Sequence, residues 1–145
     1  MNIRRYSRIK LRSVLAYTFI GDDKMDIFCK MNEGEIPCKK IYEDEEVFVI
    51  LDINPISNGH CLVIPKVHYK DLYDIDKKVL SHIIDVGIKM GDILKDKLHC
   101  EGVTFEQNNG IAQEVKHFHL HVIPRYKYDD IIDVDEVYNI ITSTN

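Results

Sequence analysis

The feature that most constrains this chain is a run near its C-terminal end in which histidine alternates with apolar residues, HFHLHVI at residues 117–123. Successive side chains of a β-strand point to opposite faces, so a strand would place His117, His119 and His121 on one face. A helix would spread positions two apart around its circumference, and the bulky, partly β-branched residues ahead of Pro124 favour a strand. We therefore expect one face of this strand to pack in the core and the other to carry chemistry.

The rest of the chain has the patterns of one mixed domain. Its 145 residues are 45% hydrophobic, which is enough to bury a core. Apolar residues recur at helical spacing over residues 76–98, which predicts one long amphipathic helix. Short apolar runs bounded by turn residues predict strands at residues 38–43, 47–52, 60–64 and 103–107, besides the histidine strand. Strands, then a helix, then closely linked strands favour an α+β fold with an antiparallel sheet.

Composition excludes several classes of partner. A net charge of −5 and a pI near 5.8 give no electrostatic footprint for wrapping a nucleic-acid polymer, although they leave room for a small basic pocket that binds a phosphate. No stretch approaches the ~20 apolar residues of a membrane-spanning helix, so we expect no membrane association. Four cysteines without a CxxC spacing indicate reduced, mostly buried thiols, which predicts a cytoplasmic protein.

Residues 1–24 differ in kind from the rest of the chain. They are basic up to Arg12 and contain no acidic residue before Asp22, and Met25 comes directly after them. A targeting peptide has this composition, but there is no clear cleavage signature, so we favour an N-terminal extension without a targeting role. We expect residues 25–145 to form the single domain, with an acidic C-terminal tail.

Three histidines on one face allow more than one chemistry. Imidazole titrates near neutrality, so the group can supply a nucleophile, a proton donor and a ligand for phosphate. His119 is flanked by both others and is best placed to attack a phosphorus, which would give a covalent phosphohistidine intermediate. His121 would then stabilise developing charge on the phosphate, and His117 would orient its neighbours. A zinc site and a purely structural role remain open at this point.

A longer block, from Asn108 to Arg125, resembles the histidine triad (HIT) family, whose motif is His-φ-His-φ-His-φ-φ with φ apolar. Further segments match in the same order: DIFCK at 26–30, GEIP at 34–37, YEDE at 42–45, LDINP at 51–55 and GHCLVIPKVH at 59–68. The resemblance spans Met25 to Arg125 and is closest to the Hint-like and bacterial nucleotide hydrolases of the family.

The resemblance implies a HIT-like fold in which the sheet is extended across a two-fold homodimer axis. It implies a purine nucleotide hydrolase in which His119 attacks the α-phosphorus, becomes nucleotidylated and is freed by water, with no cofactor required for catalysis. The implied activity is that of a nucleoside 5'-phosphoramidate hydrolase of the adenosine monophosphoramidase type. The alternatives are a dinucleoside polyphosphate hydrolase and, in another class, a nucleotide-binding or interaction protein with incidental turnover.

Matching positions also carry over the family's nucleotide contacts. Asp52 would accept the ribose hydroxyls and Ile53 would pack beside the base. His60 and Asn108 would lie near the phosphate, and Gln113 and the nearby backbone would hold phosphate oxygens. His119 and His121 would also contact the nucleotide.

This chain departs from the family pattern at two places. Glu114 stands where a serine or threonine often helps to bind the leaving group or phosphate, beside a short loop that follows Asn108, so substrate preference stays open. Several bacterial relatives hold a structural zinc, and the matching positions here are Asp26, Cys29, His68 and His117. One thiolate is therefore a carboxylate, which would lower the zinc affinity and would give His117 a structural role if the metal binds.

Overall fold

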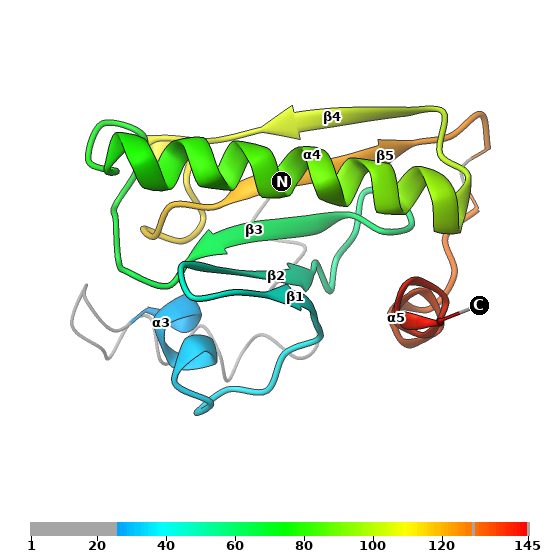
Figure 1. Cartoon of the computed structure of the whole chain (residues 1–145), viewed down its shortest axis with the longest axis horizontal. Coiled ribbons are helices and arrows are strands. Elements are labelled where there is room, and N and C mark those ends of the chain that lie inside the picture. Colours follow the sequence, from blue (N-terminus) through cyan, green and yellow to red (C-terminus); the bar gives the residue numbers. More distant parts are fainter. Residues whose placement is uncertain (1–25, 129, 145) are drawn as a thin grey trace.

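The computed structural model describes residues 26–128 and 130–144, so the N-terminal extension lies outside the described residues. Its centre is a five-stranded antiparallel sheet in the order β1-β2-β3-β5-β4 (Figure 1). The strands are β1 (Lys40–Glu43), β2 (Val47–Leu51), β3 (Cys61–Pro65), β4 (Gly102–Glu106) and β5 (Leu120–Arg125). The helices are α3 (Ile27–Asn32), α4 (Lys77–Leu98) and α5 (Val134–Thr142), with a 3₁₀ turn, η1 (Gly110–Ala112). The predicted α+β class, with an antiparallel sheet and one long helix, is confirmed.

The two faces of the sheet are covered differently. Helix α4 lies along one face (Figure 1), where its apolar stripe packs in the main core against residues such as Val63, Leu120 and Val122. The opposite face carries a smaller cluster that includes Phe28 of α3 and Leu62 of β3. Leu62 is paired with His121 across β3 and β5, so the histidines belong to this second face.

Helix α4 ends at the predicted residue and begins one residue later than predicted. The Asp76 carboxylate accepts hydrogen bonds from the backbone N–H groups of Lys78 and Val79, which caps the helix. His99 ends it in the left-handed conformation, with φ of 60°. A Cβ atom at Gly87 would lie 3.0 Å from Leu120 Cδ2, so this glycine lets the helix approach β5 closely. Within the described residues no helix has the length and apolar character needed to cross a membrane.

The histidine strand is shorter than predicted at its start. Strand β5 begins at Leu120, because its pairing with β3 starts at the Val63–Leu120 pair. The preceding segment turns to another neighbour, where the Phe118 N–H donates to the Tyr69 carbonyl at 2.7 Å. Pro124 lies inside β5 instead of ending it, and it falls beyond Val122, where pairing with β3 ends. Its missing N–H therefore interrupts no β3 ladder.

Candidate active site

The three alternating histidines are all buried and lie in a row on the second face of the sheet. The rings of His119 and His121 are 5.0 Å apart, centroid to centroid. Phe28 of α3 packs edge-on against both His119 and His117, at 5.1 and 5.7 Å. Only His121 is in the strand ladder, yet the side chains share one face as the alternation predicted.

His119 has one ring nitrogen committed and the other available. Its Nδ1 lies 2.8 Å from the His117 carbonyl, which only accepts, so Nδ1 carries the proton. The Nε2 lone pair is then free to attack an electrophile. Burial lowers the pKa of His119 to about 4, although the bond to the His117 carbonyl acts in the opposite direction. At neutral pH His119 is therefore an uncharged base with a fixed tautomer.

His121 is held in the complementary tautomer by a chain of hydrogen bonds. The Ile56 N–H donates to His60 Nδ1 at 3.0 Å, so in neutral His60 the proton is on Nε2. That N–H donates to His121 Nδ1 at 2.9 Å, which leaves the proton of His121 on its own Nε2. Burial and the neighbouring histidines lower the pKa of His121 to about 2, so it stays neutral. His121 can thus donate one hydrogen bond beside the His119 lone pair.

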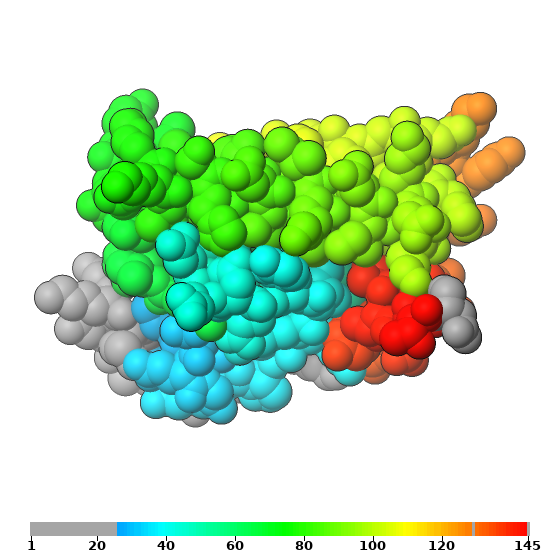
Figure 2. Space-filling view, in the orientation of Figure 1, coloured from blue at the N-terminus to red at the C-terminus, as the bar shows by residue number. Residues whose placement is uncertain are grey.

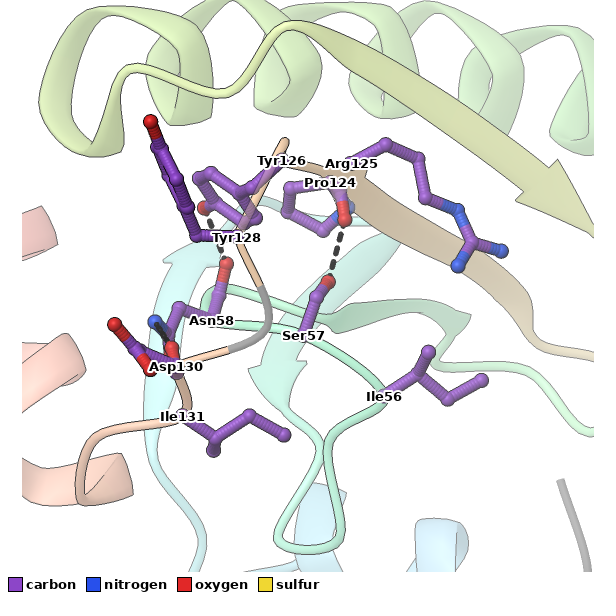
Figure 3. Close-up of a pocket in the computed structure, with 9 residues that line it drawn as sticks. All are labelled: Ile56, Ser57, Asn58, Pro124, Arg125, Tyr126, Tyr128, Asp130 and Ile131. Atoms are coloured by element: carbon purple, nitrogen blue, oxygen red, sulfur yellow. Dashed lines mark hydrogen bonds between the residues drawn. The ribbon is translucent and has the colours of Figure 1, made fainter.

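The turn that carries His60 is fixed from its other side, where it lines a pocket (Figure 3). Ser57 donates through its hydroxyl to the Pro124 carbonyl, and the Tyr126 hydroxyl donates to the Asn58 carbonyl at 2.6 Å. The Asn58 amide donates to the Asp130 carbonyl at 2.7 Å. These polar groups are already used to anchor the turn to the end of β5, so we interpret this pocket as a structural junction that positions His60.

The other predicted nucleotide contacts lie on several different segments. Asp52 is buried beside His60, with its Oδ2 3.6 Å from His60 Nε2, and its Oδ1 accepts from the Asn54 N–H. Ile53 is next in the chain on the surface and is 45% exposed, as a contact for a bound base would require. Asn108 is half-buried in the loop after β4. Gln113 is buried, and its Nε2 donates to the Lys70 carbonyl at 2.6 Å.

A second cluster, which we call the α3 cluster, joins four side chains at the other end of the histidine row: Asp26, Cys29, His68 and His117. His68 Nδ1 lies 2.9 Å from Asp26 Oδ2 and 3.7 Å from Cys29 Sγ. His117 Nδ1 lies 3.1 Å from Asp26 Oδ2 and 3.5 Å from Cys29 Sγ. Bonds of about 2.0–2.3 Å to a tetrahedral ion separate its ligand atoms by roughly 3.3–3.7 Å, so the spacing is close to that of a zinc site.

Hydrogen bonding supports this interpretation of the α3 cluster. His117 Nε2 lies 2.8 Å from the Pro65 carbonyl and therefore carries the proton, so the Nδ1 lone pair points at Asp26 and Cys29. Asp26 caps α3 with Oδ1, which accepts from the Phe28 and Cys29 N–H groups at 2.9 Å. Its Oδ2 is left to face the cluster. Nitrogen, oxygen and sulfur donors converge, which suits zinc.

A third group with converging donors, Asp52, His60 and His121, is explained without a metal. The Nε2–H of His60 already donates to the Nδ1 lone pair of His121, so hydrogen bonding accounts for this group.

Sequence reasoning missed the residues that hold the histidines in place. Phe28 packs on two of the rings, and the Pro65 carbonyl and the Ile56 N–H fix the tautomers of His117 and, through His60, of His121. Phe28 left a signal only through the family resemblance, because it lies in the matching segment DIFCK at 26–30. The two backbone groups left none, since any residue type supplies them.

Comparisons with known proteins agree with this geometry. The family model of the HIT domain matches residues 33–128. An uncharacterised HIT-like protein of Methanocaldococcus jannaschii is 44% identical over 119 residues, which is 80% of this chain and 92% of the relative. An adenosine 5'-monophosphoramidase of Candida albicans is 43% identical over 105 residues, which is 68% of this chain and 69% of the relative.

Solved structures give the same result. A zinc-bound histidine triad family protein from Mycobacterium smegmatis superposes with a TM-score of 0.76 at 35% identity, covering 83% of this chain and 93% of that one. The buried histidine row, the five-stranded sheet with its long helix and these sequence matches lead to one conclusion: the chain belongs to the histidine triad (HIT) family.

Proposed function

We propose that the protein is a purine nucleotide hydrolase that cleaves at the α-phosphorus through a nucleotidyl-His119 intermediate. The substrate class we propose is a nucleoside 5'-phosphoramidate, in which an amine is the leaving group. The similarity to a protein named adenosine 5'-monophosphoramidase supports this choice. Asp52 and Ile53 would bind the ribose and base, and His60, Asn108 and Gln113 would complete the nucleotide site.

The observation that carries the proposal is the tautomer of His119. Its proton is held by the His117 carbonyl, so Nε2 presents a lone pair that its low pKa keeps available at neutral pH. His121 presents an N–H beside it, which can bind a phosphate oxygen as negative charge develops. A nucleophile next to a donor for the developing charge is the arrangement that covalent phosphoryl transfer requires.

Incubating the wild-type protein with an adenosine 5'-phosphoramidate and with a diadenosine polyphosphate tests the proposal by AMP release. A larger kcat/KM for the phosphoramidate than for the polyphosphate supports the proposal. A preference for the polyphosphate would move the protein to the alternative hydrolase class. Binding of AMP without turnover of either substrate would leave a nucleotide-binding protein and would exclude the proposed activity.

We also propose that the α3 cluster binds a structural zinc ion. The ligands would be Asp26, Cys29, His68 and His117, and the ion would tie α3 to the start of the histidine row. This adds nothing to the chemistry at His119, whose Nε2 stays free. The zinc-bound relative from Mycobacterium smegmatis supports the choice of metal.

We expect protein purified without added metal to contain about one zinc ion per chain, because ligand donors of three kinds already converge. Cys29→Ala should lose the metal and lower the Tm. Asp26→Asn should also weaken binding, although its amide oxygen can still cap α3. Cys38→Ala, at a half-buried cysteine outside the cluster, is the control and should keep the zinc. Mass spectrometry of metal content decides, and a wild type that stays metal-free after dialysis against zinc would contradict the proposal.

A homodimer is the third part of the proposal. Strand β4 is at the edge of the sheet, and its Phe105 is 48% exposed. Ile84 and Ile88 of α4 are 43% and 53% exposed and flank Gly87, whose Cβ position would lie 3.3 Å from the Phe105 ring. The outer side of α4 forms a broad band across the molecule (Figure 2). An edge strand with adjoining apolar residues suits pairing with a second copy across a two-fold axis. Sedimentation equilibrium tests this pairing, and a result that shows only monomer would exclude the homodimer.

A further inference from the structure

Glu114 is a buried carboxyl group without a visible partner. It lies between η1 and His117 and is half-buried as a residue. Both of its carboxyl oxygens are shielded from solvent, and no described residue donates a hydrogen bond to them. Shielding a carboxyl without a partner costs free energy, so a native protein that contains one usually has a use for it.

The neighbouring Gln113 has an unused oxygen too. Because its Nε2 donates to the Lys70 carbonyl, the orientation of the amide is fixed, and its buried Oε1 has no donor among the described residues. Gln113 and Glu114 thus place three unpartnered oxygens next to one another in the chain. Such a group fits a ligand that brings N–H donors, as an amine does. A phosphate oxygen fits it less well, because that oxygen only accepts hydrogen bonds.

Among the described residues, the charged groups that act on Glu114 are both acidic. They are Asp52, which lies beside His60 and His121, and Glu106, which is paired with His121 across β4 and β5. Glu114 is therefore within electrostatic range of two residues that adjoin His121. Burial, followed by the charges of Asp52 and Glu106, raises the pKa of Glu114 to about 7. A large fraction of Glu114 therefore carries a proton at neutral pH.

The proposed reaction needs such a proton. An amine leaves phosphorus only when its nitrogen gains a proton, and the neutral histidines are poor sources of one. The N–H of His119 is bound to the His117 carbonyl, and the N–H of neutral His121 is a far weaker acid than a carboxylic acid.

We propose that Glu114 is the acid–base residue that protonates the leaving amine and then activates water, an inference that rests on the proposed phosphoramidate hydrolysis. In the first step His119 Nε2 bonds to the α-phosphorus, the P–N bond to the amine breaks, and the Glu114 proton passes to the departing nitrogen. In the second step water bonds to phosphorus and gives a proton to the Glu114 carboxylate, while the bond from phosphorus to Nε2 breaks. Neutral His119, protonated Glu114 and the nucleoside monophosphate result.

The test compares two substrates that share AMP and differ in the leaving group. An alkylamine phosphoramidate needs a proton on its leaving nitrogen, whereas the p-nitrophenyl ester of AMP releases a stable anion. Glu114→Gln should lower kcat/KM for the phosphoramidate by ~10²–10³-fold and for the ester by less than about 3-fold. Glu136→Gln, at an exposed acid on α5, is the matched control and should change neither rate.

The pH profile is a second readout. An acid must hold its proton to act, so the wild-type kcat/KM for the phosphoramidate should fall as pH rises through about 7. That fall should be absent in Glu114→Gln, whose amide does not titrate. Removing an unpartnered buried carboxyl should leave the Tm unchanged or higher, so a loss of activity is not a loss of folding.

Each remaining outcome overturns the inference. Equal effects of Glu114→Gln on both substrates, or no effect on either, would exclude the acid–base role. Hydrolysis of the phosphoramidate by the wild type would still support the proposed function. A wild type that hydrolyses neither AMP derivative would overturn the proposed function and this inference with it.

Discussion

His119→Ala reduces kcat for an adenosine 5'-phosphoramidate by ~10³-fold or more, because it removes the only nitrogen that the proposed covalent step can use. His121 cannot replace it, since its Nδ1 accepts from His60 and its Nε2 carries the proton. The binding of AMP should weaken much less, because Asp52 and Ile53 remain. The loss should therefore be in kcat and not in KM.

The control for this prediction is His99→Asn. His99 is an exposed histidine at the end of α4 in a left-handed conformation, which asparagine adopts readily. The kcat of the His99→Asn variant should match that of the wild type. If His119→Ala keeps more than about a tenth of the wild-type kcat, the nucleophile is another group, because loss of a covalent nucleophile costs far more than tenfold.

Gly59→Ala lowers the free energy of unfolding by about 2–4 kcal/mol, from backbone strain and a steric clash together. Gly59 has φ of +92°, a conformation that residues with a side chain rarely adopt. A Cβ there would lie 2.6 Å from Leu94 Cδ2 and 2.7 Å from Leu98 Cδ1. Leu94 of α4 is buried in the main core and cannot turn away freely.

Gly34→Ala separates the two causes. Gly34 has φ of +80°, but nothing lies within 4 Å of its Cβ position, so only the backbone cost of about 1 kcal/mol applies. Urea unfolding of both variants measures the difference. Equal destabilisation would mean that α4 does not press on the turn before His60.

Much of the fold was predictable because its signals are local. The spacing of apolar residues predicted α4, and the turn residues separated the strands. The alternation of the histidines predicted their common face, although not that β5 begins only at Leu120. That boundary depends on where β3 stops pairing, which no local pattern records.

Helices α5 and α3 were not predicted, for two different reasons. Helix α5 has apolar residues at Val134, Val137 and Ile141, so its helical spacing was present, but the acidic run before it was interpreted as a tail. Helix α3 has only six residues, too short for a periodic pattern, and its Asp26 cap also faces the proposed metal site.

The chemistry of the site was only partly predictable. The sequence predicted which histidines meet, but their tautomers depend on backbone groups such as the Pro65 carbonyl, 52 residues away from His117. From the sequence, Glu114 could be identified only as a departure from the family pattern, which often has a serine or threonine there. Its shielded, unpartnered carboxyl is a consequence of packing and became visible only in the structure.

The stereochemical course at the α-phosphorus tests the central claim most directly. A substrate that is chiral at this phosphorus, hydrolysed in isotopically labelled water, shows whether the reaction uses one displacement or two. Attack by His119 followed by attack by water inverts the configuration twice, so we expect overall retention. Overall inversion would mean that water attacks the substrate directly, and it would contradict a nucleotidyl-His119 intermediate.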